Sequence, residues 1–274
     1  MSIRPRFSPF VELKRGDEQP PILLAHGLDG RAGFSELAKH IRTESAIYGI
    51  QAKGLDGGEE PLERIEDMAE FYLEALSDLQ PQGPYILIGY SFGGLVALEM
   101  AQGLLKSGKK VALLVLVDAY PHPRFLSLAE RLRLMARRAG RHISEMKKMP
   151  ASGAISYFVG GLQRRLRIVG VRPGGSNLPE APQASASQTC LRVRDSAYVA
   201  FQHYRPQFYR GKIWFVSAAE NSYFPDDPVA VWSKLADEFE SETVPGGHLN
   251  IVTTEFQGLA DALTRYVKRT LRQD

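Results

Sequence analysis

Three residues of this 274-residue chain have the types and the order of a nucleophile, an acid and a base. Ser91 lies in the segment Gly-Tyr-Ser-Phe-Gly at 89–93, Asp118 follows an apolar run, and His248 lies in a glycine-rich segment near the C-terminus. A serine hydroxyl is a weak nucleophile until a nearby imidazole accepts its proton. A carboxylate that holds this imidazole also stabilises its charged form. We therefore predict that Ser91, Asp118 and His248 form a catalytic triad, with Ser91 as the nucleophile, Asp118 as the acid and His248 as the base.

The sequence around Ser91 predicts a strand, a sharp turn and a helix. An apolar run at 85–88 precedes the Gly-x-Ser-x-Gly segment, and a helix-forming run begins at Phe92. This context is typical of the strained turn that exposes a nucleophilic serine at the end of a sheet, as in α/β-hydrolases. Because the first amides of a helix carry partial positive charge, we predict that the Phe92 amide is one donor of an oxyanion hole.

A second predicted strand, at 22–26, ends in a loop that contains Gly27 and Gly30. The loop after an early strand supplies the second oxyanion donor in this architecture, and the Leu28 amide is the candidate here. His26 is an alternative base, but the base follows the nucleophile and the acid along such chains. We therefore expect His26 to shape the loop through hydrogen bonds.

The acid has alternatives. Asp118 directly follows the apolar run at 111–117, where a parallel strand would deliver it beside the strand that leads to Ser91. The next predicted strand, at 212–218, is followed by three further candidate acids: Glu220, Asp226 and Asp227.

Apolar runs alternate along the chain with amphipathic helical patterns, which predicts an α/β fold: a mostly parallel sheet flanked by helices. The remaining predicted strands lie at 10–14, 46–50 and 242–244, and the predicted helices lie at 34–41, 65–76, 92–107, 229–235 and 256–271.

Residues 122–206 interrupt this alternation, and we expect them to form an inserted helical cap, or lid. Helical patterns lie at 131–148 and 155–167, and a loop rich in Pro, Gly and Ser lies at 172–187. Residues 122–175 carry twelve basic and two acidic side chains. This stretch is either a solvated face or a docking surface for an anionic partner, such as an acidic carrier protein, coenzyme A phosphates or a membrane surface. We expect His142, Cys190 and His203 to be structural or surface residues.

Composition excludes several classes of function. The hydrophobic and charged fractions, 44% and 24%, are those of an ordinary globular domain, and the net charge of +3 gives no sign of nucleic-acid binding. One cysteine, Cys190, rules out an internal disulfide. Neither a signal peptide nor an apolar run of roughly 18 to 20 residues is present, so we predict a cytoplasmic protein without a membrane span. No metal-ligand cluster or nucleotide motif predicts a cofactor.

Short segments spread along the chain resemble one family. They are Ala-His-Gly at 25–27, Gln-Ala-Lys-Gly-Leu-Asp at 51–56, Gly-Pro-Tyr at 83–85, Gly-Tyr-Ser-Phe-Gly-Gly at 89–94, Ala-Leu-Glu-Met-Ala at 97–101, Leu-Val-Asp at 116–118 and Pro-Gly-Gly-His at 245–248. The chain resembles the thioesterase domains that end non-ribosomal peptide and polyketide assembly lines, a branch of the α/β-hydrolases.

The resemblance implies one α/β-hydrolase domain over 1–274 and selects Asp118 as the acid. It also implies a substrate: an acyl or peptidyl chain that arrives as a phosphopantetheine thioester, on a carrier protein or on coenzyme A, and moves to Ser91. Water or an internal nucleophile of the chain would then release it, by hydrolysis or by cyclisation. Two alternatives stay open: an oxygen-ester hydrolase, such as an esterase or lipase, with the same fold, and a binding module without activity.

Overall fold

The structure is a computed structural model that describes residues 7–80, 82–148, 186–220, 224–225 and 227–272, although the side chains of 138, 140–148, 186 and 187 fall outside the description. The chain divides into two compact units. One comprises 1–126 and 184–274, and the other comprises 127–183. In the second unit the described element is α4 (Leu128–Lys148). The predicted helix at 155–167 and most of the predicted loop at 172–187 lie outside the described residues.

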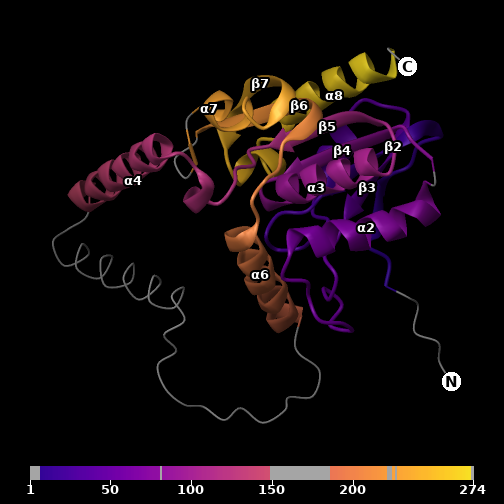
Figure 1. Cartoon of the computed structure of the whole chain (residues 1–274), viewed down its shortest axis with the longest axis horizontal. Coiled ribbons are helices and arrows are strands. Elements are labelled where there is room, and N and C mark those ends of the chain that lie inside the picture. Colours follow the sequence, from indigo (N-terminus) through magenta and orange to yellow (C-terminus); the bar gives the residue numbers. More distant parts are fainter. Residues whose placement is uncertain (1–6, 81, 149–185, 221–223, 226, 273–274) are drawn as a thin grey trace, which may run out of the picture. The chain divides into compact units, whose positions relative to one another are not determined.

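The first unit is built on a seven-stranded sheet in the order β1-β3-β2-β4-β5-β6-β7 (Figure 1). Its strands are β1 (Phe10–Lys14), β2 (Glu18–Ala25), β3 (Ser45–Ile50), β4 (Tyr85–Tyr90), β5 (Val111–Val117), β6 (Tyr209–Glu220) and β7 (Ala236–Gly247). Strand β1 pairs antiparallel with β3, and all other neighbours are parallel. The predicted mostly parallel sheet is thus confirmed. Parallel strands bring the carboxyl ends of β2, β4, β5, β6 and β7 to one edge of the sheet.

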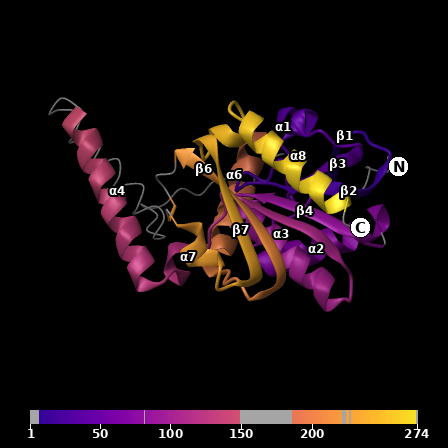
Figure 2. The same ribbon diagram turned by 90° about the horizontal axis from the view of Figure 1, so that it is seen from above.

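Helices cover both faces of this sheet (Figure 2). Helices α1 (Ser35–His40) and α8 (Gln257–Leu271) lie on one face, and α2 (Ile65–Leu79) and α3 (Phe92–Lys106) lie on the other. The remaining described elements of this unit are η1 (Pro123–Phe125), α6 (Ala186–His203), α7 (Pro228–Trp232) and η2 (Asn250–Val252).

The alternation of side chains along the buried strands explains the two covered faces. Ile22 and Leu24 on β2 belong to the core cluster that includes Leu37 of α1 and Leu263 of α8. Leu23, between them, is equally buried and points to the opposite face, because successive strand residues alternate. Each such Leu or Ile contributes about 1.5 to 3 kcal/mol through burial. A strand buried on both faces reads as a continuous apolar run, which is why β2, β4 and β5 are visible in the sequence.

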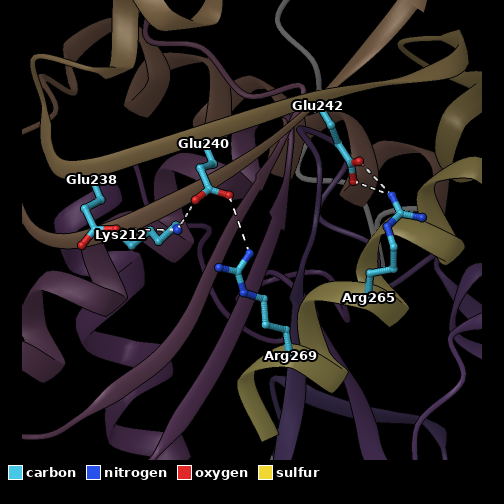
Figure 3. Close-up of polar contacts among 6 residues, drawn as sticks. All are labelled: Lys212, Glu238, Glu240, Glu242, Arg265 and Arg269. Carbon is cyan, nitrogen blue, oxygen red and sulfur yellow. Dashed lines mark hydrogen bonds and ion pairs between the residues drawn. The ribbon is translucent and has the colours of Figure 1, made fainter. Parts of the chain in front are cut away.

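Strand β7 has a different character, because it lies at one edge of the sheet, opposite the edge formed by β1. A row of ion pairs along one of its faces joins it to β6 and α8, formed by Lys212, Glu238, Glu240, Glu242, Arg265 and Arg269 (Figure 3). The Arg265 guanidinium lies 2.8 and 3.0 Å from the two carboxylate oxygens of Glu242. These charges interrupt the apolar pattern, which explains why the sequence predicts a strand only at 242–244 when β7 covers Ala236–Gly247.

Helix α6 was not predicted from the sequence. Its buried side chains are Thr189, Val193, Ala197 and Ala200, which recur every three or four residues. This spacing is helical, but two of the four are alanines and one is a threonine, so the apolar stripe is weak.

Candidate active site

Ser91 stands alone between β4 and α3, at the sharp turn that the sequence predicts. Its backbone has φ 54° and ψ −120°, a conformation that costs a non-glycine residue about 1 to 3 kcal/mol. The Ser91 amide donates a hydrogen bond to the main-chain oxygen of Val117 at 2.8 Å, which fixes the turn to β5. The strained turn therefore holds the Ser91 side chain at the carboxyl edge of the sheet.

Two glycines allow this turn. A Cβ atom on Gly89 would lie 2.2 Å from the main-chain oxygen of Gly93, and a Cβ atom on Gly93 would lie 2.2 Å from that of His26. Either contact is far too short for real atoms, so any side chain there would push the turn apart. The second contact also shows that the end of β2 touches the first turn of α3.

The structure brings Ser91, Asp118 and His248 together. The His248 Nε2 atom lies 3.1 Å from Ser91 Oγ, and the His248 Nδ1 atom lies 2.6 Å from Asp118 Oδ2. A carboxylate only accepts hydrogen bonds, so we assign the proton of the neutral ring to Nδ1. The Nε2 lone pair then faces the serine hydroxyl, as a general base requires.

Asp118 is fully buried, and with Ser91 it is one of two non-glycine residues with positive φ in the described part of the chain, at φ 47°. Its amide donates to the main-chain oxygen of Val216 at 2.7 Å. Among the described residues its Oδ1 atom has no hydrogen-bond partner, and Oδ2 makes the hydrogen bond to His248.

The structure describes two of the three alternative acids, Asp227 and Glu220. Asp227 accepts a hydrogen bond from the Ala230 amide at 3.1 Å and caps α7. Glu220 is exposed at the end of β6, opposite Gly247 in the sheet register. Asp226 lies outside the described residues. Of the three candidate acids that the structure describes, Asp118 is the one with a hydrogen bond to His248.

His26 is buried and shapes the loop after β2, as expected. Its Nδ1 atom lies 2.7 Å from the main-chain oxygen of Gly27, and its Nε2 atom lies 2.9 Å from the hydroxyl of Tyr72. Burial lowers the pKa of His26, against smaller opposing effects of the Gly27 hydrogen bond and of Asp29. A neutral ring that donates from Nδ1 and accepts at Nε2 satisfies both contacts.

The candidate oxyanion donors are the amides of Leu28 and Phe92. Phe92 is the first residue of α3, where helix amides have no partner inside the helix. Among the described hydrogen bonds none has the Leu28 amide as donor. The contact between the end of β2 and the first turn of α3 places both residues in adjoining segments.

Two aromatic rings border His248. The Tyr90 ring stacks on the imidazole with centroids 5.1 Å apart, and the Phe224 ring lies 4.7 Å from it. The contacts of Tyr90 with His248 and of Tyr72 with His26 were not predicted. They join residues far apart in the sequence, and the signal available was an aromatic residue at the position before Ser91.

The described residues contain no group of three or more His, Cys, Asp or Glu side chains suited to a metal ion. In the same part of the chain, no helix combines the length and the hydropathy needed to cross a bilayer.

Comparison with known proteins identifies the family. A family model described as "Thioesterase domain" matches residues 20–267, which is most of the chain. The chain belongs to the thioesterase domain family. It is a hydrolase with the α/β-hydrolase thioesterase fold.

Curated relatives of this thioesterase domain are named as synthetases or synthases, some of them nonribosomal peptide synthetases. Malpibaldin synthetase of Mortierella alpina is 30% identical over 215 residues, which cover 78% of this chain and 3% of the synthetase. A dimodular nonribosomal peptide synthase of Bacillus subtilis (strain 168) is 39% identical over 121 residues, which cover 44% of this chain and 5% of the synthase. The thioesterase domain thus spans a small fraction of the length of the curated relatives it matches.

Solved structures share the fold. The thioesterase domain of NocB superposes with a TM-score of 0.61 at 22% identity, covering 91% of this chain and 95% of NocB's. The type II thioesterase BorB, from the borrelidin biosynthetic cluster, superposes with a TM-score of 0.64 at 18% identity, covering 97% of this chain and 100% of BorB's. At these identities the superpositions establish the fold of the thioesterase domain.

Proposed function

We propose that the chain is a serine thioesterase that releases an acyl or peptidyl chain from a phosphopantetheine thioester through an ester on Ser91. The thiol carrier is a carrier protein or coenzyme A. The observation that carries this proposal is the continuous line of contacts from Ser91 Oγ through His248 to Asp118 Oδ2, at 3.1 and 2.6 Å. Its support from relatives is that one of the proteins matched by this domain is a dimodular nonribosomal peptide synthase.

In the acylation step, His248 Nε2 takes the Ser91 proton while Oγ attacks the thioester carbonyl. The tetrahedral intermediate then collapses, the carbon–sulfur bond breaks, and His248 returns the proton to the sulfur, so that a neutral thiol leaves. The buried Asp118 carboxylate stabilises the imidazolium that exists between these two proton transfers. The amides of Leu28 and Phe92 stabilise the negative oxygen of the intermediate.

In the second step a nucleophile attacks the Ser91 ester, and the same groups act in reverse. His248 takes a proton from water or from a hydroxyl or amine within the bound chain, and then returns it to Ser91 Oγ. Water gives a free acid, and the internal nucleophile gives a ring. We propose that the insertion at 122–206 acts as a lid that selects the acyl chain and limits the entry of water. The exclusion of water would favour ring closure.

We propose that the basic stretch at 122–175 receives an anionic carrier partner. Arg137 lies on α4, whereas the side chains of Arg138 and Arg141 lie outside the described residues. We expect the triple change Arg137→Glu, Arg138→Glu, Arg141→Glu to weaken carrier binding and to flatten its dependence on ionic strength. Titrations at two salt concentrations measure both. If the variant binds the carrier with the affinities of the unchanged protein, this stretch is a solvated face and not a docking surface.

The decisive experiment is intact mass spectrometry of the protein mixed with a series of acyl-pantetheine thioesters. We expect a mass increase that peptide mapping assigns to Ser91 and that is absent in Ser91→Ala. The mass of the released product then separates the two outcomes of the second step, because a cyclic product is lighter than the free acid by one water.

The same experiment separates the alternatives. Matched oxygen esters tested in parallel address the alternative that the chain is an esterase. If oxygen esters acylate Ser91 and thioesters do not, the chain is an esterase and the thioesterase proposal is wrong. A fluorophosphonate probe tests for an activated serine. The NocB thioesterase domain has been solved as a covalent complex with a fluorophosphonate nocardicin G analogue. Failure of the probe to label folded protein at Ser91 would indicate a binding module without activity.

A further inference from the structure

We propose that Tyr90 is a positioning residue that holds His248 within hydrogen-bond distance of Ser91 and Asp118. Its hydroxyl tethers the main chain of His248 while its ring supports the imidazole. This inference rests on the proposed role of His248 as the base.

Two contacts join Tyr90 to His248. The Tyr90 hydroxyl donates a hydrogen bond to the main-chain oxygen of His248 at 2.8 Å. The two rings stack with centroids 5.1 Å apart and an angle of 27° between their planes. One side chain therefore fixes both the backbone position of His248 and the orientation of its ring.

His248 needs such a support because its own segment offers little. It follows the glycine pair 246–247 at the end of the edge strand, and Gly246 has φ 106°, a conformation open to glycine. The next residue, Leu249, is 70% exposed. A glycine pair is open to many backbone conformations, whereas the proposed chemistry requires His248 Nε2 at one distance from Ser91 Oγ.

Tyr90 is suited to this task because it is itself fixed. It is the last residue of the buried central strand β4 and directly precedes Ser91. Its ring meets Phe34 edge to face, with centroids 6.1 Å apart. A Cβ atom on Gly27 would lie 3.4 Å from the Tyr90 ring, so the ring also packs against the loop that contains Leu28. The side chain thus touches the loop of the base and the loop of one oxyanion donor.

The Tyr90 hydroxyl also stays a donor. Burial raises its pKa, and the nearby carboxylates of Asp118 and Asp29 raise it further. The hydroxyl therefore keeps its proton over the pH range in which the enzyme is expected to work.

The test compares Tyr90→Phe with Tyr85→Phe. Both tyrosines lie on β4, and the Tyr85 hydroxyl also donates to a main-chain oxygen, that of Gln80, at 3.2 Å. Both variants keep the ring and lose one hydrogen bond to the backbone, so both are expected to fold with similar small decreases in melting temperature. Only the Tyr90 variant releases the base.

We expect Tyr90→Phe to lower kcat for thioester turnover and the limiting rate of Ser91 labelling by a fluorophosphonate about tenfold, because a lost hydrogen bond of ordinary strength lets His248 leave its working position. KM is expected to stay unchanged. Proton NMR provides a direct readout, because the His248 Nδ1 proton in the short contact to Asp118 gives a strongly deshielded resonance. This resonance is expected to broaden in Tyr90→Phe and to persist in Tyr85→Phe.

Equal rates and equal resonances in the two variants would overturn the proposal, and so would a change confined to KM, which would indicate a substrate contact. The labelling and NMR readouts are independent of thioester turnover. If the unchanged protein is labelled at Ser91 but turns over no thioester, the proposed function fails while the positioning role of Tyr90 is still decided by these two readouts.

Discussion

Asp118 is fully buried, and among the described residues its side chain makes one hydrogen bond, from Oδ2 to His248 at 2.6 Å. Asparagine in its place would keep the volume but would offer an amide to the ring, which favours the wrong tautomer. We expect Asp118→Asn to lower kcat on the order of 10⁴-fold with little effect on the fold. The loss in kcat is measured with the acyl-pantetheine thioester that the unchanged protein prefers.

Asp227→Asn is the matched control for that substitution. Asparagine caps a helix about as well as aspartate does, so α7 should keep its cap, and turnover should stay near that of the unchanged protein. A large loss in Asp227→Asn together with an active Asp118→Asn would move the acid to the loop after β6.

The buried ring of His26 makes stability depend on pH. Its pKa is lowered in the folded protein, mainly by burial, from the ordinary value of 6.5. Below this value the unfolded chain binds a proton that the folded protein does not, so the unfolding free energy falls as pH falls. We expect the stability advantage of the unchanged protein over His26→Gln to shrink as pH drops below 6.5, by at most about 1.4 kcal/mol per pH unit.

Urea unfolding at pH 8 and pH 5 measures this difference. His40→Gln is the matched control, because His40 is exposed. A constant difference between the unchanged protein and His26→Gln over this range would mean that His26 takes up its proton without unfolding.

The turn between β4 and α3 depends on close contact between elements. A Cβ atom on Gly93 would meet the main-chain oxygens of His26 and Ala25 at 2.2 and 2.5 Å, whereas one on Gly33 would meet nothing within 4 Å. We expect Gly93→Ala to destabilise the protein by about 1 to 3 kcal/mol, as overpacking does, and to slow fluorophosphonate labelling of Ser91. Gly33→Ala should change stability by less than about 0.5 kcal/mol. Equal unfolding free energies for the two variants would contradict the contact.

The strands that the sequence predicts well are those that are buried on both faces of the sheet. Strands β2, β4 and β5 are covered on both faces, so each is a run of apolar residues with no alternation to misread. Strand β7 is an edge strand whose acids pair with Lys212, Arg265 and Arg269, and those partners come from elements that only the folded chain brings together. Ser91, Asp118 and His248 could be proposed from the sequence for a related reason, because each of them follows a predicted strand.

The contacts that position the site residues could not be predicted from the sequence. Tyr90 reaches His248 across 158 residues of sequence, and His26 reaches Tyr72 across 46. Neither pair has a spacing that a helix or strand period would reveal, because each contact depends on the order of strands in the sheet.

The sheet ends at one edge in β7, whose outer main-chain groups face no further strand of the sheet. Charged side chains on such a strand oppose its pairing with a second copy. We expect the triple change Glu238→Thr, Glu240→Thr, Glu242→Thr to produce association that increases with concentration, measured by sedimentation velocity. The control changes Glu59, Glu60 and Glu63 to Thr, with the same change in net charge outside any strand. Association of both variants would attribute the effect to net charge.

The left-handed backbone of Ser91 and Asp118 sets a limit on how this enzyme can be engineered. Glycine adopts such conformations without the penalty that a side chain brings, so Ser91→Gly relieves strain at the same moment that it removes the nucleophile. A library selected only for heat resistance would therefore enrich inactive members at these two positions. Directed evolution of this protein needs a selection for turnover in every round, because at these positions the most stable sequence is inactive.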